Sequence, residues 1–400
     1  MNERIIFHID VNNAFLSWTA VDLLKNGHKT DIRNIPSVIG GDESSRHGIV
    51  LAKSPVAKKY GIVTAETLYS ARKKCSDLKV FSGNYKLYSA MSDKLFEYLS
   101  QYSPDIERAS IDECYIDMTN THYLYKEPTE CAYKINKEVK EKFGFTVNVG
   151  IANNKLCAKM ASDFEKPDKI HTLFKDEIET KMWILPIGDL YMIGRKTNEK
   201  LKQLGIKTIG DLAKTDINFL KKHFKSFSTV MWEFANGIDN AKVESETSKN
   251  KSISVSHTLP KDTDDITELK RVLRRQVDEV GRSLRKQGVY ATVIAVTFKT
   301  TNFVSYSKQM KIPNPTDLTE DIYKYAEEIL LKAWNYDFIR SIGVRLASFT
   351  EKRTQQLSLF DKNPSAKEDS VQRTLDKINE KYGTNSIIPA SLLSKKEEKN

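Results

Sequence analysis

The chain has 400 residues, of which 40% are hydrophobic and 29% charged, and 63 Lys and Arg against 53 Asp and Glu give a formal net charge of +10. These proportions are typical of a globular protein of about two to four domains, and they exclude a mostly disordered chain, a collagen and a coiled-coil rod. Four cysteines without a CxxC spacing argue against a disulfide framework or a zinc cluster, and suit a reducing cytoplasm. Because no apolar run approaches the roughly 18 residues of a membrane span, we expect no membrane association.

The first part of the chain predicts an α+β arrangement. Residues 5–9 form an apolar run that ends at Asp10, so a buried strand would deliver a carboxylate to its C-terminal end. The segments that follow alternate between expected helices and expected strands, with the helices on one side of the strands. Helices are expected over residues 12–24, 54–76, 85–102 and 154–163, and strands over residues 49–52, 106–118 and 145–151.

The second part divides into a helical segment, a linker and a compact module. Residues 183–240 read as all-helical, and the polar stretch 241–251 is the best linker candidate. Residues 252–350 follow the order β-α-β-β-α-β, a split βαβ unit. The first helix of this module is expected to carry one apolar face, formed by Leu269, Val272, Leu273, Val277, Val280 and Leu284. Between residues 249 and 311 there are 13 Lys or Arg and 6 Asp or Glu. This concentrated charge favours nucleic-acid binding over the alternative, a solvated helix face with incidental arginines. A last short helix is expected around residues 371–382.

Three acidic residues stand at predicted strand ends. Asp10 follows the first apolar run, and Asp112 and Glu113 are adjacent in the later strand pair. Neighbouring residues on a regular strand point to opposite faces, so these two can share a site only at a turn or a bulge. At a hairpin apex beside Asp10, three carboxylates would repel one another without divalent cations, and such oxygen ligands favour Mg²⁺ or Mn²⁺. The alternative is that they are surface acids that follow strands, and spacing alone does not decide between the two.

The segments around these acids resemble a known family. Residues 7–15 and 109–113 resemble the two metal-binding motifs of the Y-family of translesion DNA polymerases, most closely its bacterial UmuC/UvrX-like branch. The similarity continues through residues 57–62 and 149–163, Lys166-Pro167 and the region of Gly194, in the family's order. It implies an α+β, multidomain, right-hand polymerase. Its expected parts are the palm (residues 1–12 and 80–173), fingers (13–79), helical thumb with a helix-hairpin-helix (174–240), linker (241–251), little finger (252–350) and C-terminal tail (351–400).

The resemblance also implies the catalytic residues. Asp10, Asp112 and Glu113 take the metal-ligand positions, with the backbone carbonyl of Val11 as an additional ligand. They would hold two Mg²⁺ ions, for which Mn²⁺ can substitute. Such a pair of ions activates a 3′-hydroxyl and stabilises the leaving pyrophosphate.

Further positions match those that bind the incoming dNTP, namely Ala14, Phe15, Ser54, Lys58 and Lys166. Phe15 falls at the steric gate, where its ring would clash with a ribose 2′-hydroxyl, although the residue alone is equally well a core aromatic. Lys58 and Lys166 would hold the triphosphate as point charges. The chain departs from the family at Pro55 and Lys58, where Tyr-x-Ala-Arg is common, so the tyrosine contact and the bidentate arginine are absent and the triphosphate grip is altered.

Two DNA-binding regions are expected. Gly194, Arg195 and Gly205 belong to a helix-hairpin-helix pattern, in which glycine lets the backbone approach a phosphate. The alternative is a plain helix connector. In the basic module the expected DNA contacts are Arg274, Arg275, Arg282 and Arg285.

A short peptide near the C-terminus resembles the bacterial sliding-clamp-binding motif. Residues 355–360 read Gln-Gln-Leu-Ser-Leu-Phe, and exposed apolar side chains in a polar tail need a partner's pocket. The alternative is a tail that folds back on its own domain. The expected clamp contacts are Gln356, Leu357, Leu359 and Phe360.

The sequence therefore predicts a template-directed DNA polymerase that acts in lesion bypass and DNA repair, with low fidelity and without proofreading. Its expected partners are primer–template DNA, dNTP and a sliding clamp, and we expect a cytoplasmic, nucleoid-associated monomer. One alternative is a non-catalytic, clamp-recruited DNA-binding scaffold, which has no need of all three acids. A repair nuclease would need a further acidic cluster near residues 190–240, and none is evident.

Overall fold

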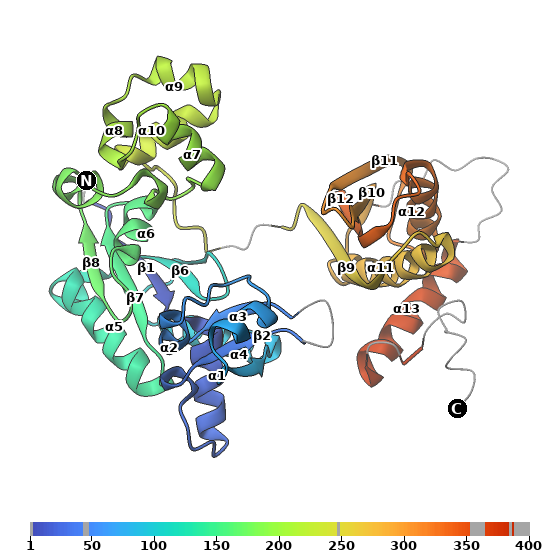
Figure 1. The fold of residues 1–400 in the computed structure, drawn as a ribbon, viewed down its shortest axis with the longest axis horizontal. Coiled ribbons are helices and arrows are strands. Elements are labelled where there is room, and N and C mark those ends of the chain that lie inside the picture. Colours follow the sequence, from blue (N-terminus) through green and yellow to red (C-terminus); the bar gives the residue numbers. More distant parts are fainter. Residues whose placement is uncertain (1–2, 43–47, 246–248, 353–364, 384–385, 388–400) are drawn as a thin grey trace. The chain divides into compact units, whose positions relative to one another are not determined.

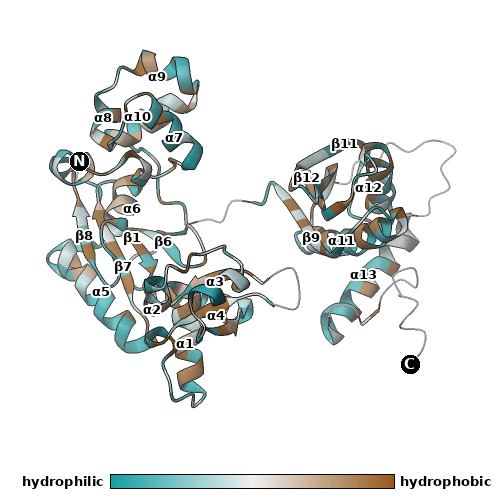
Figure 2. Cartoon of the chain, viewed as in Figure 1, coloured by the Kyte–Doolittle hydropathy of each residue, from teal (hydrophilic) through white to brown (hydrophobic). Residues whose placement is uncertain are grey.

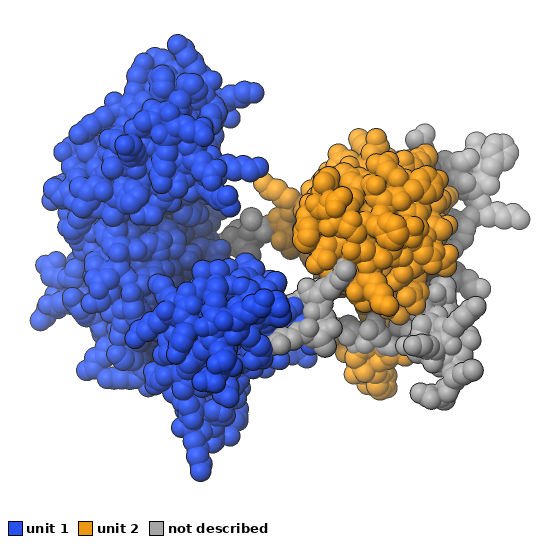
Figure 3. All heavy atoms as spheres, in the orientation of Figure 1, with its two compact units in different colours: residues 1–247 blue, residues 248–400 orange. Residues whose placement is uncertain are grey.

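A computed structural model of the chain describes residues 3–42, 48–245, 249–352, 365–383 and 386–387. The chain forms two compact units, residues 1–247 and 248–400, which we describe separately (Figure 3). The boundary between them falls inside the expected linker. Within the described ranges no helix combines the length and the apolar character that crossing a membrane requires.

A five-stranded sheet of order β5-β6-β1-β7-β8 forms the centre of the first unit (Figure 1). β1 lies in the middle and runs antiparallel to both of its neighbours. All residues of β1 and of β7 are buried, so both faces of the sheet must be covered. The strands are β1 (Ile6–Val11), β5 (Ile106–Arg108), β6 (Glu113–Asp117), β7 (Val147–Ala152) and β8 (Ile170–Leu173).

Helices cover both faces of this sheet, which corrects the expectation that they lie on one side. Phe7, Ile9 and Val11 pack against α1 (Ala14–Lys25), α4 (Tyr85–Leu99) and α5 (Pro128–Phe143). Figure 2 shows α5 with a hydrophilic outer side and hydrophobic residues toward the sheet. Ile6 packs on the opposite face with α6 (Lys155–Asp163). Since side chains alternate along a strand, His8 and Asp10 also face α6.

A smaller layer with its own core precedes α4. A three-stranded sheet of order β3-β2-β4 packs with two short helices around buried apolar residues that include Val38, Val50 and Leu68. The elements are η1 (Ile32–Asn34), β2 (Ser37–Gly40), β3 (Val50–Lys53), α2 (Pro55–Lys59), α3 (Leu68–Lys74) and β4 (Lys79–Ser82).

The segment expected to be all-helical is helical in the structure. Its helices share a hydrophobic core with α6, in which Leu201 and Met231 pack with Leu156 and Met160. The helices of this segment are η5 (Ile187–Asp189), α7 (Arg195–Gln203), α8 (Ile209–Lys214), α9 (Ile217–Phe224) and α10 (Phe227–Ala235). Three short helices, η2 (His122–Tyr125), η3 (Lys175–Glu177) and η4 (Ile178–Met182), precede it in the chain.

The start of the expected linker is bound to the first unit. Arg4 Nη1 donates to the carbonyl of Ala241 at 3.1 Å, and the backbone N–H of Glu244 donates to Glu107 Oε2 at 2.8 Å. Val243 packs against the core around α6. Residues 241–244 of the expected linker are therefore held by the first unit.

The second unit confirms the expected order β-α-β-β-α-β. A four-stranded sheet of order β11-β10-β12-β9 carries α11 and α12 on one face. The predicted apolar stripe of α11, from Leu269 to Leu284, is buried against this sheet. The elements are β9 (Ser252–Thr263), α11 (Ile266–Lys286), β10 (Tyr290–Thr300), β11 (Ser305–Thr316), α12 (Thr319–Ala333), β12 (Ile339–Thr350) and a last helix α13 (Ser365–Tyr382).

Candidate active site

Two of the predicted carboxylates meet at the centre of the first sheet. Asp10 and Glu113 are opposite each other in the β1–β6 register. Asp10 is buried, with 6% of the residue exposed, and Glu113 is half-buried. Lys159, on α6, lies 3.4 Å from Asp10 Oδ2 and 2.9 Å from Glu113 Oε1 through its Nζ atom. A single cation thus contacts both carboxylates.

Asp112 lies in the turn of the β5–β6 hairpin, beside the other two acids. The backbone N–H of Val11 donates to the carbonyl of Asp112 at 3.0 Å, which ties the turn to the end of β1. The Asp112 side chain accepts a hydrogen bond from Ser110 Oγ at 2.6 Å. Within the described part of the chain, no three acidic, histidine or cysteine side chains are arranged to hold a metal ion together. The structure therefore brings the carboxylates of Asp10 and Glu113 together, whereas the Asp112 carboxylate is hydrogen-bonded to Ser110.

A second lysine reaches the same aspartate from the loop after α6. Lys166 Nζ lies 2.6 Å from Asp10 Oδ2 and 2.8 Å from Asp163 Oδ1. Lys159 also contacts Asp163, at 3.3 Å. Lys159 and Asp163 are not among the site residues predicted from the sequence. Their signal is a Lys–Asp pair four residues apart on a helix whose other residues are mostly apolar and buried.

Burial and the neighbouring charges set the protonation of this cluster. Burial raises the pKa of the Asp10 carboxyl to about 6, against the opposing effect of Lys166. The pKa of Glu113 is lowered by His8, whose Nε2 lies 3.6 Å from Oε2, and by Lys159. Burial lowers the pKa of His8, so this imidazole is neutral at pH 7, and its Nδ1 is hydrogen-bonded to Ser162 Oγ at 2.8 Å. A buried Asp10 carboxylate is stabilised by any cation held beside it.

The donor chemistry of this site fits a divalent cation. Asp10 and Glu113 supply carboxylate oxygens, which are hard ligands of the kind that Mg²⁺ takes, and Val11, the residue after Asp10, would add its backbone carbonyl. The contact of one Lys159 nitrogen with both carboxylates shows that one cation can reach them together.

Phe15 lies directly after this site, in the first turn of α1. Its ring is stacked on that of Tyr88, with a centroid distance of 4.6 Å and an interplanar angle of 13°. The side chain is half-buried at the edge of the core. The N-cap residue Asn13 has a left-handed backbone, with φ 51°, and its side chain makes no capping hydrogen bond. The first N–H groups of α1 therefore receive no capping hydrogen bond from the Asn13 side chain.

The two predicted nucleotide contacts around α2 differ in their environment. Lys58 is exposed in the last turn of this helix. Ser54 is fully buried, and its hydroxyl accepts from the backbone N–H of Ala57 at 2.9 Å and donates to the carbonyl of Ile35 at 2.7 Å. The Ser54 side chain caps α2, so the structure does not support a direct contact between this hydroxyl and a nucleotide.

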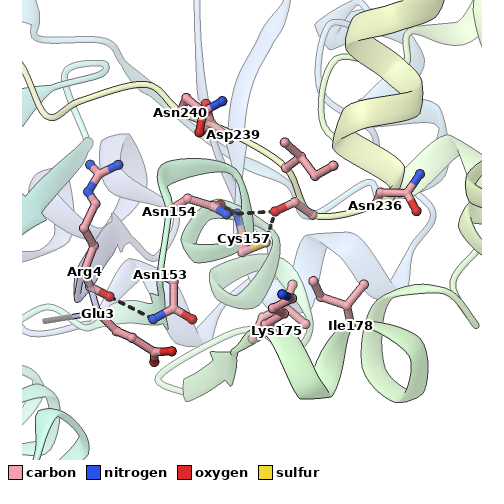
Figure 4. Close-up of a pocket in the computed structure, with 13 residues that line it drawn as sticks. Glu3, Arg4, Asn153, Asn154, Cys157, Lys175, Ile178, Asn236, Asp239 and Asn240 are labelled. Atoms are coloured by element: carbon pink, nitrogen blue, oxygen red, sulfur yellow. Dashed lines mark hydrogen bonds between the residues drawn. The ribbon is translucent and has the colours of Figure 1, made fainter. Parts of the chain in front are cut away.

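A cavity of about 380 Å³ lies elsewhere in the first unit, at the N-terminal end of α6 (Figure 4). Asn154 caps α6 and also donates to the carbonyl of Gly237 at 2.8 Å, while Asn153 donates to the carbonyl of Arg4 at 2.9 Å. The residues that line this cavity include none of the predicted site residues. It is separate from the carboxylate cluster.

The predicted helix-hairpin-helix is formed by α7 and α8. Gly194 is the N-cap of α7, and Gly205 has φ 84° in the turn between the helices, a conformation that favours glycine. An added Cβ at either glycine would meet no atom within 4 Å, so this turn is open at the surface. The Arg195 side chain is exposed.

The predicted arginines of the second unit lie on α11, and Arg274 and Arg285 among them pair with acidic residues of the unit. Arg274 pairs with Glu320 and Asp278. Arg285, whose side chain is 6% exposed, pairs with Asp376 of α13 at 2.5 Å and donates to the carbonyl of Asp317. Arg275 is exposed and Arg282 half-buried. For Arg274 and Arg285 these contacts show a structural role, and DNA binding by all four stays a prediction.

The sheet face away from α11 and α12 carries a different basic surface. Since Ile294, Val296 and Phe298 point into the core, Thr297 and Lys299 lie on the opposite face. The register places small or polar residues beside them on the neighbouring strands. At Gly343 an added Cβ would lie 2.7 Å from Thr297 Oγ1, so the face is closely packed there. We call this surface the open sheet face, and its charged or hydroxyl-bearing members are Ser252, Ser254, Ser256, Thr258, Thr297, Lys299, Ser305, Ser307, Lys311, Ser341 and Arg345.

The residues predicted to bind a sliding clamp, Gln356, Leu357, Leu359 and Phe360, lie outside the described residues. The chain before them ends in β12, and the chain after them forms α13, whose Asp376 binds Arg285.

Comparisons with known proteins agree with this arrangement. The impB/mucB/samB family matches residues 9–163, its C-terminal domain residues 250–359 and its helix-hairpin-helix motif residues 175–206. A DNA polymerase IV of Clostridium acetobutylicum is 48% identical over 395 residues, which cover 99% of this chain and 100% of that protein. DNA polymerase IV 1 of Bacillus subtilis is 35% identical over 399 residues, which cover 99% of this chain and 95% of that protein.

A solved structure of a Y-family DNA polymerase chimera aligns with a TM-score of 0.76 and 25% sequence identity, covering 87% of this chain and 100% of that one. The relatives carry the name DNA polymerase IV, whereas the motifs by themselves pointed to the UmuC/UvrX-like branch. The family expected from the sequence is confirmed at both levels, sequence and fold. The chain belongs to the impB/mucB/samB family of Y-family DNA polymerases.

Proposed function

We propose that this translesion DNA polymerase transfers a nucleotide from dNTP to a primer 3′-hydroxyl at the cluster of Asp10, Asp112 and Glu113, with two Mg²⁺ ions as cofactors and Mn²⁺ able to substitute. The observation that carries the proposal is the shared contact of Lys159 with Asp10 and Glu113, because it demonstrates that both carboxylates reach one cation. When bound, the ions supply the positive charge that activates the hydroxyl and stabilises the leaving pyrophosphate.

The residues of this chain hold and orient the ligands around that chemistry. Asp10, Glu113 and the carbonyl of Val11 would bind the ions directly, with Asp112 turning from Ser110 to join them. Lys166, whose ammonium lies beside Asp10, would form an ion pair with the triphosphate. The first turn of α1, with Ala14 and Phe15, would donate backbone N–H groups to phosphate oxygens. Lys58 is exposed on the neighbouring α2 and would add a second positive charge.

We further assign Phe15 as the steric gate. Its ring is held by the stack on Tyr88, so it cannot turn aside when a ribonucleotide enters. A rigid ring beside the sugar excludes a 2′-hydroxyl by overlap, and this selects dNTP.

We propose the same domain boundaries that the sequence predicts. The palm comprises residues 1–12 and 80–173, the fingers 13–79, the thumb 174–240 and the little finger 252–350. The linker runs from 241 to 251, and its first four residues are bound to the first unit through Arg4 and Glu107. DNA would be held by the α7–α8 hairpin through backbone groups, and by the open sheet face of the second unit through Lys299, Lys311 and Arg345.

The remaining partners rest on the sequence. Residues 356–360 would bind a sliding clamp, and the polymerase would act as a monomer at the nucleoid. Deleting 356–360 is expected to lower clamp-stimulated synthesis and to leave synthesis without the clamp unchanged. Equal loss in both assays would contradict clamp binding by this peptide.

Primer extension tests the proposed function. The full-length chain, an undamaged and an abasic template, and all four dNTPs are incubated with Mg²⁺, with Mn²⁺ or with EDTA. We expect extension on both templates with either ion and none with EDTA. Asp112→Ala should lose extension while its Kd for primer–template stays near that of the unmodified protein. If the Asp112→Ala variant extends the primer normally, Asp112 is not a metal ligand. If the unmodified protein binds primer–template but does not extend the primer, the scaffold alternative is supported.

A further inference from the structure

A fully buried asparagine lies next to the proposed active site on the other side of β1. Asn148 is the residue of β7 that pairs with Asp10 in the β1–β7 register, and none of its surface is exposed. A buried amide is costly unless its hydrogen bonds are made. Neither the family resemblance nor the motif pattern singled out this residue.

The Asn148 amide makes all four of the hydrogen bonds of which it is capable. Its Nδ2 donates to the carbonyls of Ser162 at 3.0 Å and Glu165 at 2.6 Å. Its Oδ1 accepts from Asn12 Nδ2 at 2.9 Å and from the backbone N–H of Lys169 at 3.2 Å. Three of these four partners are backbone groups between the last turn of α6 and the start of β8.

These contacts are made on both sides of Lys166 along the chain. Glu165 and Lys169 lie on either side of it in the loop, and Ser162 fixes the helix end from which the loop departs. Asn12 reinforces the same loop, because its Oδ1 accepts from the backbone N–H of Asp168 at 2.9 Å. The loop is therefore fastened to β7 and β1 by side-chain amides, and the lysine between the fastened points reaches Asp10 at 2.6 Å.

We propose that Asn148 is a positioning residue for nucleotide binding, which holds the loop of residues 163–169 so that the Lys166 ammonium stays beside Asp10 and meets the triphosphate. The inference rests on the proposed role of Lys166. A flexible lysine side chain gives little binding energy unless its backbone is fixed, so loss of the amide weakens triphosphate binding without removing any charge.

The test compares Asn148→Ala with a matched control in the full-length protein. Asn136, on α5, also holds β7, because its Nδ2 donates to the carbonyl of Val147 at 2.8 Å, but it does not touch the loop. Steady-state extension at varied dNTP should show KM for dNTP raised about 10-fold in Asn148→Ala and unchanged in Asn136→Ala. The Kd for primer–template should be unchanged in both.

A double-mutant cycle separates this inference from the proposed function. Lys166→Ala should raise KM for dNTP, and Asn148→Ala added to it should raise KM no further, because the asparagine acts through the lysine. Fully additive effects, or a KM for Asn148→Ala equal to that for Asn136→Ala, overturn the positioning role and leave the Lys166 assignment intact. A normal KM for dNTP in Lys166→Ala overturns both the role of Lys166 in triphosphate binding and the positioning role of Asn148. If thermal unfolding shows that Asn148→Ala does not fold, Asn148→Ser, which keeps one donor, is expected to raise KM by a smaller factor, and an unchanged KM there overturns the inference.

Discussion

Asp10 and Glu113 face each other across β1 and β6, and the nitrogen of Lys159 lies 3.4 Å from one carboxylate and 2.9 Å from the other. Both acids are strand residues, so the backbone ladder fixes their separation. Asp112 precedes β6 in the hairpin turn, where its side chain accepts a hydrogen bond from Ser110. The proposed metal site thus combines two carboxylates on the sheet with one on a turn.

Replacing either sheet carboxylate by its amide is expected to stop catalysis without unfolding the chain. Asp10→Asn and Glu113→Gln keep the side-chain volume and remove a metal-binding charge, so kcat for primer extension should fall by about 100-fold or more. Primer–template binding, measured by fluorescence anisotropy, should change little. Substantial extension by Glu113→Gln at saturating Mg²⁺ would contradict its assignment as a ligand.

Removing the Phe15 ring is expected to relax sugar selection. Phe15→Ala opens the space beside the stack on Tyr88, so ribonucleotide incorporation relative to dNTP should rise, and the half-buried position should cost about 1–3 kcal/mol of unfolding free energy. The measurement is single-nucleotide extension with rNTP and dNTP. Tyr88→Phe is the matched control, since it keeps the stacked ring and removes only the hydroxyl that is hydrogen-bonded to Thr19 at 3.0 Å. Equal sugar selection in Phe15→Ala and the control would rule out the gate.

Charges on the open sheet face and on α11 are expected to act differently. Replacing Lys299, Lys311 and Arg345 together by Ala should weaken primer–template binding, and the slope of log K against log salt should fall by about 1 for each phosphate that is no longer neutralised. Arg285→Ala breaks a nearly buried ion pair with Asp376, so it should lower the unfolding temperature more than the DNA affinity. DNA binding that depends on Arg285 and not on the three sheet residues would reverse this assignment.

The cysteine thiols are expected to be inert in the folded protein. All four are buried, and burial raises the pKa of Cys131 and of Cys157 to about 12, and that of Cys114 further above its ordinary value. The thiolate is the reactive form, so at pH 8 a disulfide reagent such as DTNB should react slowly with the native chain and rapidly in urea. A thiol that reacts at once in the native state would show that its surroundings open.

Local patterns in the sequence were enough to predict much of this protein. The apolar run before Asp10, the stripe from Leu269 to Leu284 and the β-α-β-β-α-β order each follow from the periodicity of neighbouring residues, and the structure confirms them. The motifs around Asp10 and Glu113 identified the family, because they combine residue types that rarely occur together by chance. The prediction that helices lie on only one side of the first sheet was wrong, because a strand that is buried along its whole length, such as β7, requires cover on both faces.

The tertiary structure alone decided which charges meet. Lys159 and Asn148 acquire their roles from partners on other strands and loops, and Arg285 is held by a helix about ninety residues later in the chain. A sequence pattern records the spacing of residues along the chain. The distance between two side chains from remote segments, and the burial that makes their charge costly, are set by how the sheets and helices pack.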